Sequence, residues 1–185
     1  MFTKNFYSVL VRTLFNEDAP IKRTDGSEQD AAYAERYSNI SISTTGTKNY
    51  WHAFMYKWAS TIYSEGVFFG TGTTAPTKDD YKPENALTES DISVANPSQI
   101  IVNQTDDYIE AIVCFAVTNI SSSAITISEI GCLGFLRGSS NASYYTADST
   151  HPPYLAERQL LETPITLEAG EAEGIQYRVR FSYGA

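Results

Sequence analysis

Residues 67–81 read VFFGTGTTAPTKDDY, and this stretch decides how the rest of the chain is interpreted. Its first three residues are β-branched or aromatic, which predicts a short buried strand. Gly70 and Gly72 can adopt positive φ or let another backbone approach closely. Because Pro76 disfavours helix at the residue before it, we expect the chain to leave the strand as an ordered turn.

A strand followed by glycines also raises the alternative of a phosphate-binding loop. Such a loop requires a Gly-Lys-Ser/Thr ending or a third glycine that leads into a helix. Pro76 stands where that helix would begin, so the sequence favours a structural turn without a cofactor. The predicted turn residues are Gly70, Gly72, Pro76, Asp79, Asp80 and Tyr81.

Further motifs follow this turn in a fixed order along the chain. They are residues 127–131 (ISEIG), 155–158 (LAER), 163–164 (TP), 169–171 (AGE) and the alternating run 175–181. Together with the Gly-Thr-Gly-Thr-Thr-x-Pro-Thr-x-Asp-Asp-Tyr segment, this order resembles small structural proteins of tailed bacteriophages. The resemblance covers residues 67–181. It implies a virion protein that is made in the host bacterial cytoplasm and contacts other virion proteins.

The composition is that of a globular chain with many strands. Of 185 residues, 42% are hydrophobic and only 19% are charged, and there are 13 Tyr and 9 Phe. High Tyr, Ser and Thr content with little Lys and Glu suits strands and contact surfaces. The formal net charge of −9 argues against a nucleic-acid partner, since neutralising phosphates requires a basic face. We also expect no membrane partner, because no window approaches 18 consecutive apolar residues.

Short alternating segments joined by turn residues predict a mainly β fold, an antiparallel β-sandwich or jelly roll. Residues 109–119 form the strongest predicted strand. Apolar residues on both of its faces indicate either a central strand or a strand that lies under a subunit contact. Residues 175–183 alternate as in a half-buried strand, with Phe181 in the core and Arg180 on the opposite face.

One or two short helices are expected in the N-terminal third. Apolar spacing in residues 2–14 favours a helix, and residues 50–63 fit either a helix or a strand. Residues 16–30 are polar and are expected to form a loop or arm. We therefore divide the chain into an N-terminal segment, residues 1–48, and a β-sandwich domain, residues 49–185.

Candidate chemical groups are few. Cys114 and Cys132 lie in apolar runs and are expected to be buried free thiols, with a single bridge as the alternative. His52 and His151 occur in no catalytic motif, so we expect no catalytic residues. The paired carboxylates at 79–80 and 106–107 are interpreted as solvated corners, and no metal site is expected.

The resemblance implies a structural protein of a tailed-phage virion, on the head surface or in the tail, and the lack of a catalytic motif agrees with a non-enzymatic role. It is expected to form a homo-oligomer, with a trimer as the first expectation. The alternative is a module that binds host glycan or a receptor through Tyr- and Trp-rich loops. A concave cluster of exposed aromatics would favour that module, whereas flat self-complementary patches would favour an assembly protein.

Overall fold

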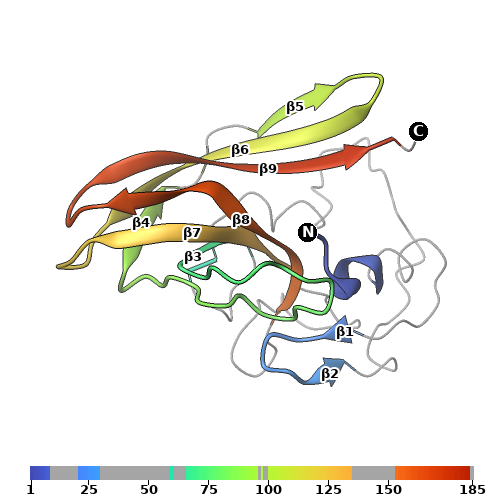
Figure 1. Ribbon diagram of the computed structural model, residues 1–185, viewed down its shortest axis with the longest axis horizontal. Helices are drawn as coiled ribbons and strands as arrows, with labels where there is room; N and C mark the ends of the chain where they lie inside the picture. Colours follow the sequence, from blue (N-terminus) through green and yellow to red (C-terminus); the bar gives the residue numbers. More distant parts are fainter. Residues whose placement is uncertain are drawn as a thin grey trace, which may run out of the picture.

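The structure, a computed structural model, is mainly β and antiparallel, as the sequence predicts (Figure 1). It describes residues 1–8, 21–29, 59–60, 66–95, 97, 100–134 and 153–183. The predicted boundary between residues 48 and 49 and both histidines lie outside these ranges. So does the helix or strand expected at residues 50–63, apart from residues 59 and 60, which belong to neither.

One sheet has the order β3-β7-β8. It is formed by β3 (Gly66–Gly70), β7 (Ile125–Gly134) and β8 (Tyr154–Leu167), all antiparallel. β3 is the strand predicted from its apolar residues, and every one of its residues is buried. The ladder between β7 and β8 shifts register between Ile127 and Glu129. This shift lies next to the Glu129–Gly131 segment, where the sequence suggests a bulge.

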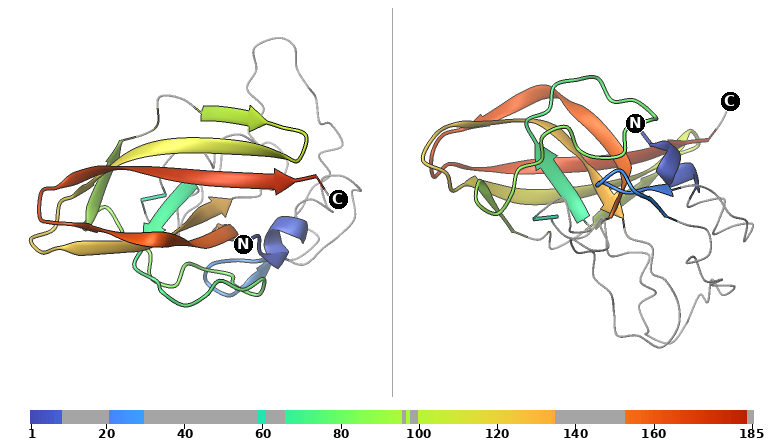
Figure 2. Two further views of the ribbon diagram at one scale, coloured as in Figure 1. Left: turned by 45° about the horizontal axis from the view of Figure 1, so that its top comes forward. Right: turned by 90° about the horizontal axis from the view of Figure 1, so that it is seen from below.

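The second sheet is built around β6 (Tyr108–Asn119). β4 (Ile92–Ala95) and β5 (Ile100–Gln104) pair with successive parts of one edge of β6. β9 (Ala172–Ser182) pairs with the other edge along almost its whole length. The turned views of Figure 2 show this sheet and the β3-β7-β8 sheet as separate groups of strands.

The N-terminal residues contain less helix than predicted. Among the described residues, only 4–8 are helical, and they form little more than one turn. Within the expected polar arm, β1 (Ile21–Lys22) and β2 (Glu28–Gln29) form a small antiparallel hairpin instead of a plain loop. Gly26 has φ +87° in its turn, a conformation that glycine adopts without a steric penalty.

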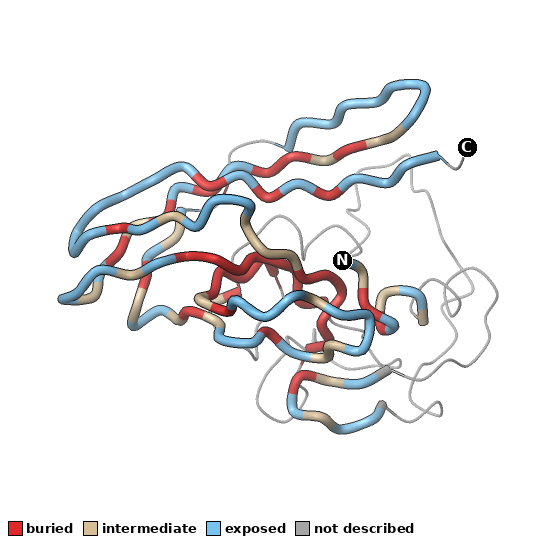
Figure 3. Tube along the Cα trace, viewed as in Figure 1, coloured by how far each residue is buried: buried red, intermediate tan, exposed pale blue. Residues whose placement is uncertain are grey.

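A single apolar cluster takes side chains from both larger sheets. Its fully or nearly buried members include Val67, Phe69, Ile92, Val113, Phe115, Val117, Ile127, Ile130, Cys132, Leu167, Ile175, Tyr177 and Val179. The buried positions follow β3, β7 and the first part of β8 most continuously (Figure 3). Alternation along β6 and β9 sends every second side chain into this cluster.

Within the single chain, only one face of residues 109–119 is buried. A central strand buried on both faces is therefore excluded, and a subunit contact over the second face stays a prediction. Val113, Phe115 and Val117 are buried, but Cys114 and Ala116 on the opposite face of β6 are exposed. Side chains of neighbouring strands cover the outer face only in part, around Glu110 and Ile112. Cys114 is therefore exposed, which differs from the prediction, whereas Cys132 is buried as predicted, and neither cysteine forms a disulfide.

The placement of Phe181 in the core is also wrong. Its side chain is 44% exposed, and its ring stacks on those of Phe2 and Phe6 with centroids 5.1 and 6.1 Å away. Phe181 lies opposite Ile109, near the end of β9. The buried alternation of β9 thus ends at Val179.

Candidate functional site

Gly70 ends β3, and the other predicted turn residues belong to a long excursion, residues 71–86, which we call the Gly-Thr loop. It leaves β3 and returns beside it, because Gly70 and Ala86 form an isolated antiparallel bridge. Thr71 N donates to the carbonyl of Asn85 at 2.9 Å, and Leu87 N donates to that of Phe69 at 2.8 Å. The excursion is therefore closed at its base like a long hairpin.

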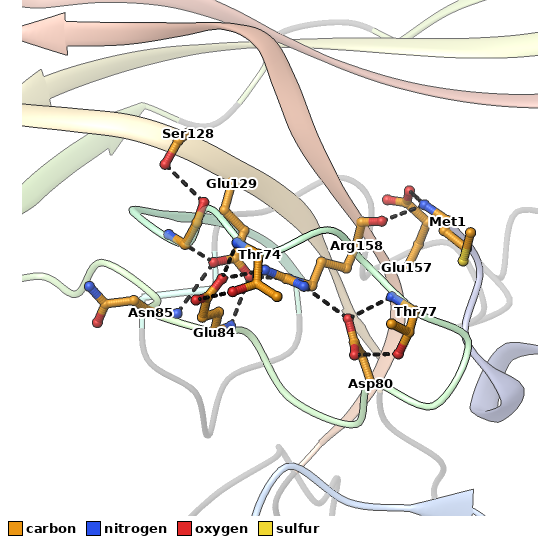
Figure 4. Close-up of polar contacts among 11 residues, drawn as sticks. Met1, Thr74, Thr77, Asp80, Glu84, Asn85, Ser128, Glu129, Glu157 and Arg158 are labelled. Carbon is orange, nitrogen blue, oxygen red and sulfur yellow. Dashed lines mark hydrogen bonds and ion pairs between the residues drawn. The ribbon is translucent and has the colours of Figure 1, made fainter.

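Arg158, on β8, is the centre to which the loop is attached. Its Nε donates to Glu129 Oε1 at 2.8 Å, its Nη1 to Asp80 Oδ2 at 2.9 Å and its Nη2 to Glu84 Oε2 at 2.8 Å (Figure 4). The Arg158 side chain is only 4% exposed. One guanidinium thus joins two adjacent strands to two points of the Gly-Thr loop. We call these four residues the Arg158 cluster.

Glu129, on β7, holds the loop backbone as well as Arg158. Its carboxylate accepts hydrogen bonds from the amides of Gly72 at 3.1 Å, Glu84 at 2.9 Å and Asn85 at 3.3 Å. Its side chain is fully buried. A buried carboxylate requires several donors to offset its lost hydration, and here it has a guanidinium and three amides.

The two loop carboxylates of the cluster also organise the loop itself. Asp80 accepts from the amide of Thr77 at 3.1 Å and from its hydroxyl at 2.7 Å. Glu84 accepts from the amide and hydroxyl of Thr74 at 2.8 and 2.7 Å. Thr74 and Thr77 therefore each donate to a carboxylate through both the amide and the hydroxyl.

Gly70 and Gly72 are required because neighbouring atoms lie too close for a Cβ, and not because their backbone has positive φ. Gly70 and Gly72 do not have the positive φ seen at Gly26, Gly66 and Gly170. A Cβ at Gly72 would lie 2.0 Å from Glu129 Oε2, and one at Gly70 would lie 2.7 Å from the Asn85 carbonyl oxygen.

Gly131, on β7, is constrained in the same way. A Cβ there would lie 2.2 Å from the Glu157 carbonyl oxygen and 2.7 Å from Phe68 Cε1. These two contacts come from β8 and β3, so the glycine lets both neighbouring strands approach β7 closely.

The ion pairs and hydrogen bonds of the cluster displace several pKa values. Burial alone would raise the pKa of Asp80, but hydrogen bonds from Thr77 and the charge of Arg158 hold it below its ordinary value. The hydroxyl and amide of Thr74, helped by Arg158, lower the pKa of Glu84. Burial works against the charge of Arg158, yet Glu129 and Asp80 raise its pKa. All three groups are therefore charged near neutral pH.

The remaining predicted residues lie on the outer part of the loop. Asp79 forms an ion pair with Lys4, which lowers the pKa of its carboxyl. The ring of Tyr81 is covered by the ammonium of Lys22, 4.1 Å from the ring centroid. Pro76 makes no polar contact of note and is half-buried. Asp79 and Tyr81 therefore connect the loop to the N-terminal residues.

The N-terminal residues also pair with the outer edge of β8. Thr3 N donates to the Ala156 carbonyl and Arg158 N to that of Met1, both at 3.1 Å. The Met1 ammonium lies 2.9 Å from Glu157 Oε1, and Tyr177 Oη donates to Glu157 Oε2 at 2.8 Å. Burial raises the pKa of Glu157 in spite of these partners, and burial together with the charge of Glu157 raises that of Tyr177.

This arrangement binds the loop rather than a ligand. The amides of Gly72, Thr74, Thr77, Glu84 and Asn85 point at carboxylates of the chain itself. An anion entering the loop would have to displace these carboxylates before it could use the amides. Among the described residues, no three His, Cys, Asp or Glu side chains are grouped as a metal site requires.

Sequence reasoning identified the loop but missed Glu84, Glu129 and Arg158. Glu129 occurs between Ile127 and Ile130, and Arg158 follows Leu155 and Ala156. A charged residue inside a strand that is otherwise apolar is the signal that could have identified both as a buried pair.

Comparison of the chain with protein-family models, with curated proteins and with solved structures finds no match. In the described ranges, no helix has the length and apolar character needed to cross a bilayer.

Proposed function

We propose that this chain is a non-enzymatic structural component of a tailed-bacteriophage virion, with its two larger sheets packed as an antiparallel β-sandwich. The sandwich is supported by the apolar cluster, which joins Phe69 and Ile130 of one sheet to Phe115 and Tyr177 of the other. In this proposal the chain is made in the host bacterial cytoplasm and acts by contacts with itself and with other virion proteins.

The observation that carries the proposal is the convergence of three separated motifs on one cluster. The Gly-Thr-Gly-Thr-Thr-x-Pro-Thr-x-Asp-Asp-Tyr segment supplies Asp80, the Ile-x-Glu-Ile-Gly segment supplies Glu129 and the Leu-x-x-Arg segment supplies Arg158. The pieces of the resemblance therefore belong to one physical unit. This makes a chance agreement of short motifs a poor explanation for their order.

The chemistry of the cluster supports a structural role. Three of the five N–H donors of the Arg158 guanidinium, one each on Nε, Nη1 and Nη2, already bind carboxylates of the chain. The side chain is also only 4% exposed, which leaves little of it for a ligand. Such a cluster fixes the shape of a surface loop. A fixed loop is an advantage for a protein that must present the same surface in every copy of an assembly.

The location of the protein tests this function directly. Particles should be purified by density gradient from a lysate of cells that carry the gene, and their proteins quantified by mass spectrometry. We expect this chain at a constant ratio to the major capsid protein in every particle fraction. Its absence from particles, with abundant protein left in the soluble lysate, would overturn the proposal.

A host-glycan or receptor-binding module is the second candidate. Tyr7, Phe181 and Tyr183 are exposed and supply aromatic surface at one end of β9. Binding of the purified chain to host cells or to their isolated surface glycans, lost on Tyr183→Ala, would favour this candidate. The structural proposal expects no such binding.

A further inference from the structure

Strand β5 presents an unusual edge. Each of its five residues, IIVNQ, is exposed, including Ile100 at 39%, Ile101 at 46% and Val102 at 61%. β5 pairs with β6 on one side only, and its other side pairs with no strand in the described part of the chain. Among the described strands, β5 lies outermost in both Figure 1 and the left view of Figure 2. Apolar side chains and unpaired backbone groups therefore reach solvent together.

The other described edges are protected in ways that β5 is not. β3 is completely buried, and residues 1–3 cover the outer edge of β8. β9 carries the exposed charges of Arg178 and Arg180. β4 is only four residues long. Proteins use burial, covering elements, charge and short length to prevent edge strands from pairing with other chains. β5 is exposed and uncharged, and no described element covers its free edge.

We propose that β5 is the site of self-association, where it pairs antiparallel with β5 of a second copy about a two-fold axis near Val102. The proposal takes from the proposed function only that the chain associates with itself. The β6-centred sheets of the two copies then become one continuous sheet. The free backbone N–H and C=O groups of β5 in each copy form hydrogen bonds with those of the other copy.

The composition of β5 favours a second copy as the occupant. The added strand must be uncharged and must carry apolar side chains on both faces, since Ile101 and Val102 point to opposite faces. β5 itself has this pattern. A two-fold axis at Val102 places Ile100 opposite Gln104 and Ile101 opposite Asn103, so neither pair brings two charges together.

Charge decides the direction of pairing. The turn after β5 carries Asp106 and Asp107. Parallel pairing in register would set these carboxylates beside their equivalents, which is destabilising. Antiparallel pairing about Val102 places the Asp106 and Asp107 of the two copies beyond opposite ends of the paired strands, which keeps these carboxylates apart.

The apolar pairing at Val102 continues onto the neighbouring strands β6 and β9. Val102 pairs with Ala111, which pairs in turn with Val179. The two-fold axis joins this row to its own copy and gives an uninterrupted apolar row across six strands. This is the self-complementary contact that an isologous interface requires. A two-fold pairing gives a dimer, which differs from the trimer expected from the sequence.

Sedimentation equilibrium of the purified full chain over a range of concentrations tests the pairing. We expect a reversible increase in mass from 20.5 kDa to twice that value. Val102→Lys should keep the chain monomeric over the same range, with the circular dichroism spectrum and melting curve unchanged, because Val102 is an exposed side chain. Ile120→Lys, at a site 51% exposed and outside β5, should dimerise like the wild type.

Cross-linking tests the register. In a Cys114→Ser background, Val102→Cys should form an intermolecular disulfide under mild oxidation, whereas Asn103→Cys should not. A wild-type chain that stays monomeric at every concentration, or a Val102→Lys variant that still dimerises, overturns the proposal. Capture of a different protein by a monomeric chain would also overturn it and would reassign the edge to that partner. None of these outcomes depends on whether the chain is found in virions.

Discussion

Arg158 is a buried cation with three carboxylates around it, so the loss of its charge should be costly. Arg158→Met keeps much of the side-chain volume but leaves Glu129 buried with no cation beside it. Breaking one partner of a buried pair in this way typically destabilises by about 3–5 kcal/mol. We expect a loss of that size in the free energy of unfolding, measured by urea denaturation.

Arg178→Met is the matched control for this substitution. Arg178 is 52% exposed, and its nearest carboxylate contact, to Glu110, is 3.9 Å. Exposed pairs contribute only about 0–1 kcal/mol, so this variant should unfold almost like the wild type. Equal losses for the two variants would contradict the assignment of Arg158 as the centre of the cluster.

Gly72→Ala should destabilise the protein by overpacking. The added Cβ would fall 2.0 Å from Glu129 Oε2 and 2.7 Å from Glu84 Cβ, so two members of the cluster must move. Overpacking of this kind costs about 1–3 kcal/mol. Gly174→Ala is the control, because its Cβ would meet only Cys114 Sγ at 3.9 Å. Thermal melts of the two variants should differ clearly, and similar melting temperatures would count against the close approach.

The sequence predicts the loop but not the residues that hold it. Glycines, threonines and a proline act locally, so their pattern is readable within a few positions. Arg158 lies 29 positions from Glu129 and 78 from Asp80. No local pattern joins residues so far apart, because their contact depends on how β7 and β8 pair. Only the placement of charges inside apolar strands hints at it.

Strands were predicted more reliably than their exposed faces. The segments predicted as strands at 67–69, 109–119 and 175–183 form β3, β6 and β9, since alternation and β-branched content act within each segment. Which face is covered depends on the other sheet and on how far it extends. That is why Cys114 and Phe181 are exposed although their neighbours in sequence are apolar.

Phe181→Ala should therefore cost much less than a substitution in the core. Phe181 is 44% exposed, and its truncation should reduce the free energy of unfolding by about 1–2 kcal/mol. Phe69→Ala, at a fully buried site 5.6 Å from the ring of Phe115, should cost about 3–5 kcal/mol. Urea denaturation of both variants measures the difference. A larger loss for Phe181 would mean that the stack with Phe2 and Phe6 is more important than its exposure indicates.

The stability of the entire chain should depend on pH through groups with opposite shifts. The folded-state pKa values of Asp80 and Glu84 are lowered from 3.8 and 4.5. Each binds protons more weakly in the folded chain than in the unfolded one. Their contribution to the free energy of unfolding is therefore complete above those ordinary pKa values, and it is lost as the pH falls through the lowered pKa values.

Glu157 acts in the opposite direction. Its folded-state pKa is raised above 4.5 by burial, so between 4.5 and that raised value the folded chain holds a proton that the unfolded chain has released. Stability from this group is complete below pH 4.5 and declines as the pH rises through the folded-state pKa. Glu157→Gln keeps an acceptor for Tyr177 but does not titrate, so it should remove this decline.

Urea denaturation from about pH 3 to pH 8 separates the two effects. The wild type should lose stability on the acid side and, through Glu157, also lose some above pH 4.5. Asp80→Asn should reduce only the loss of stability at acid pH. Glu157→Gln should reduce only the loss of stability above pH 4.5. If Glu157→Gln leaves the upper side unchanged, the Met1 ammonium and Tyr177 stabilise the carboxylate enough to offset its burial. If Asp80→Asn leaves the acid side unchanged, acid unfolding begins at other carboxylates and not in the Gly-Thr loop.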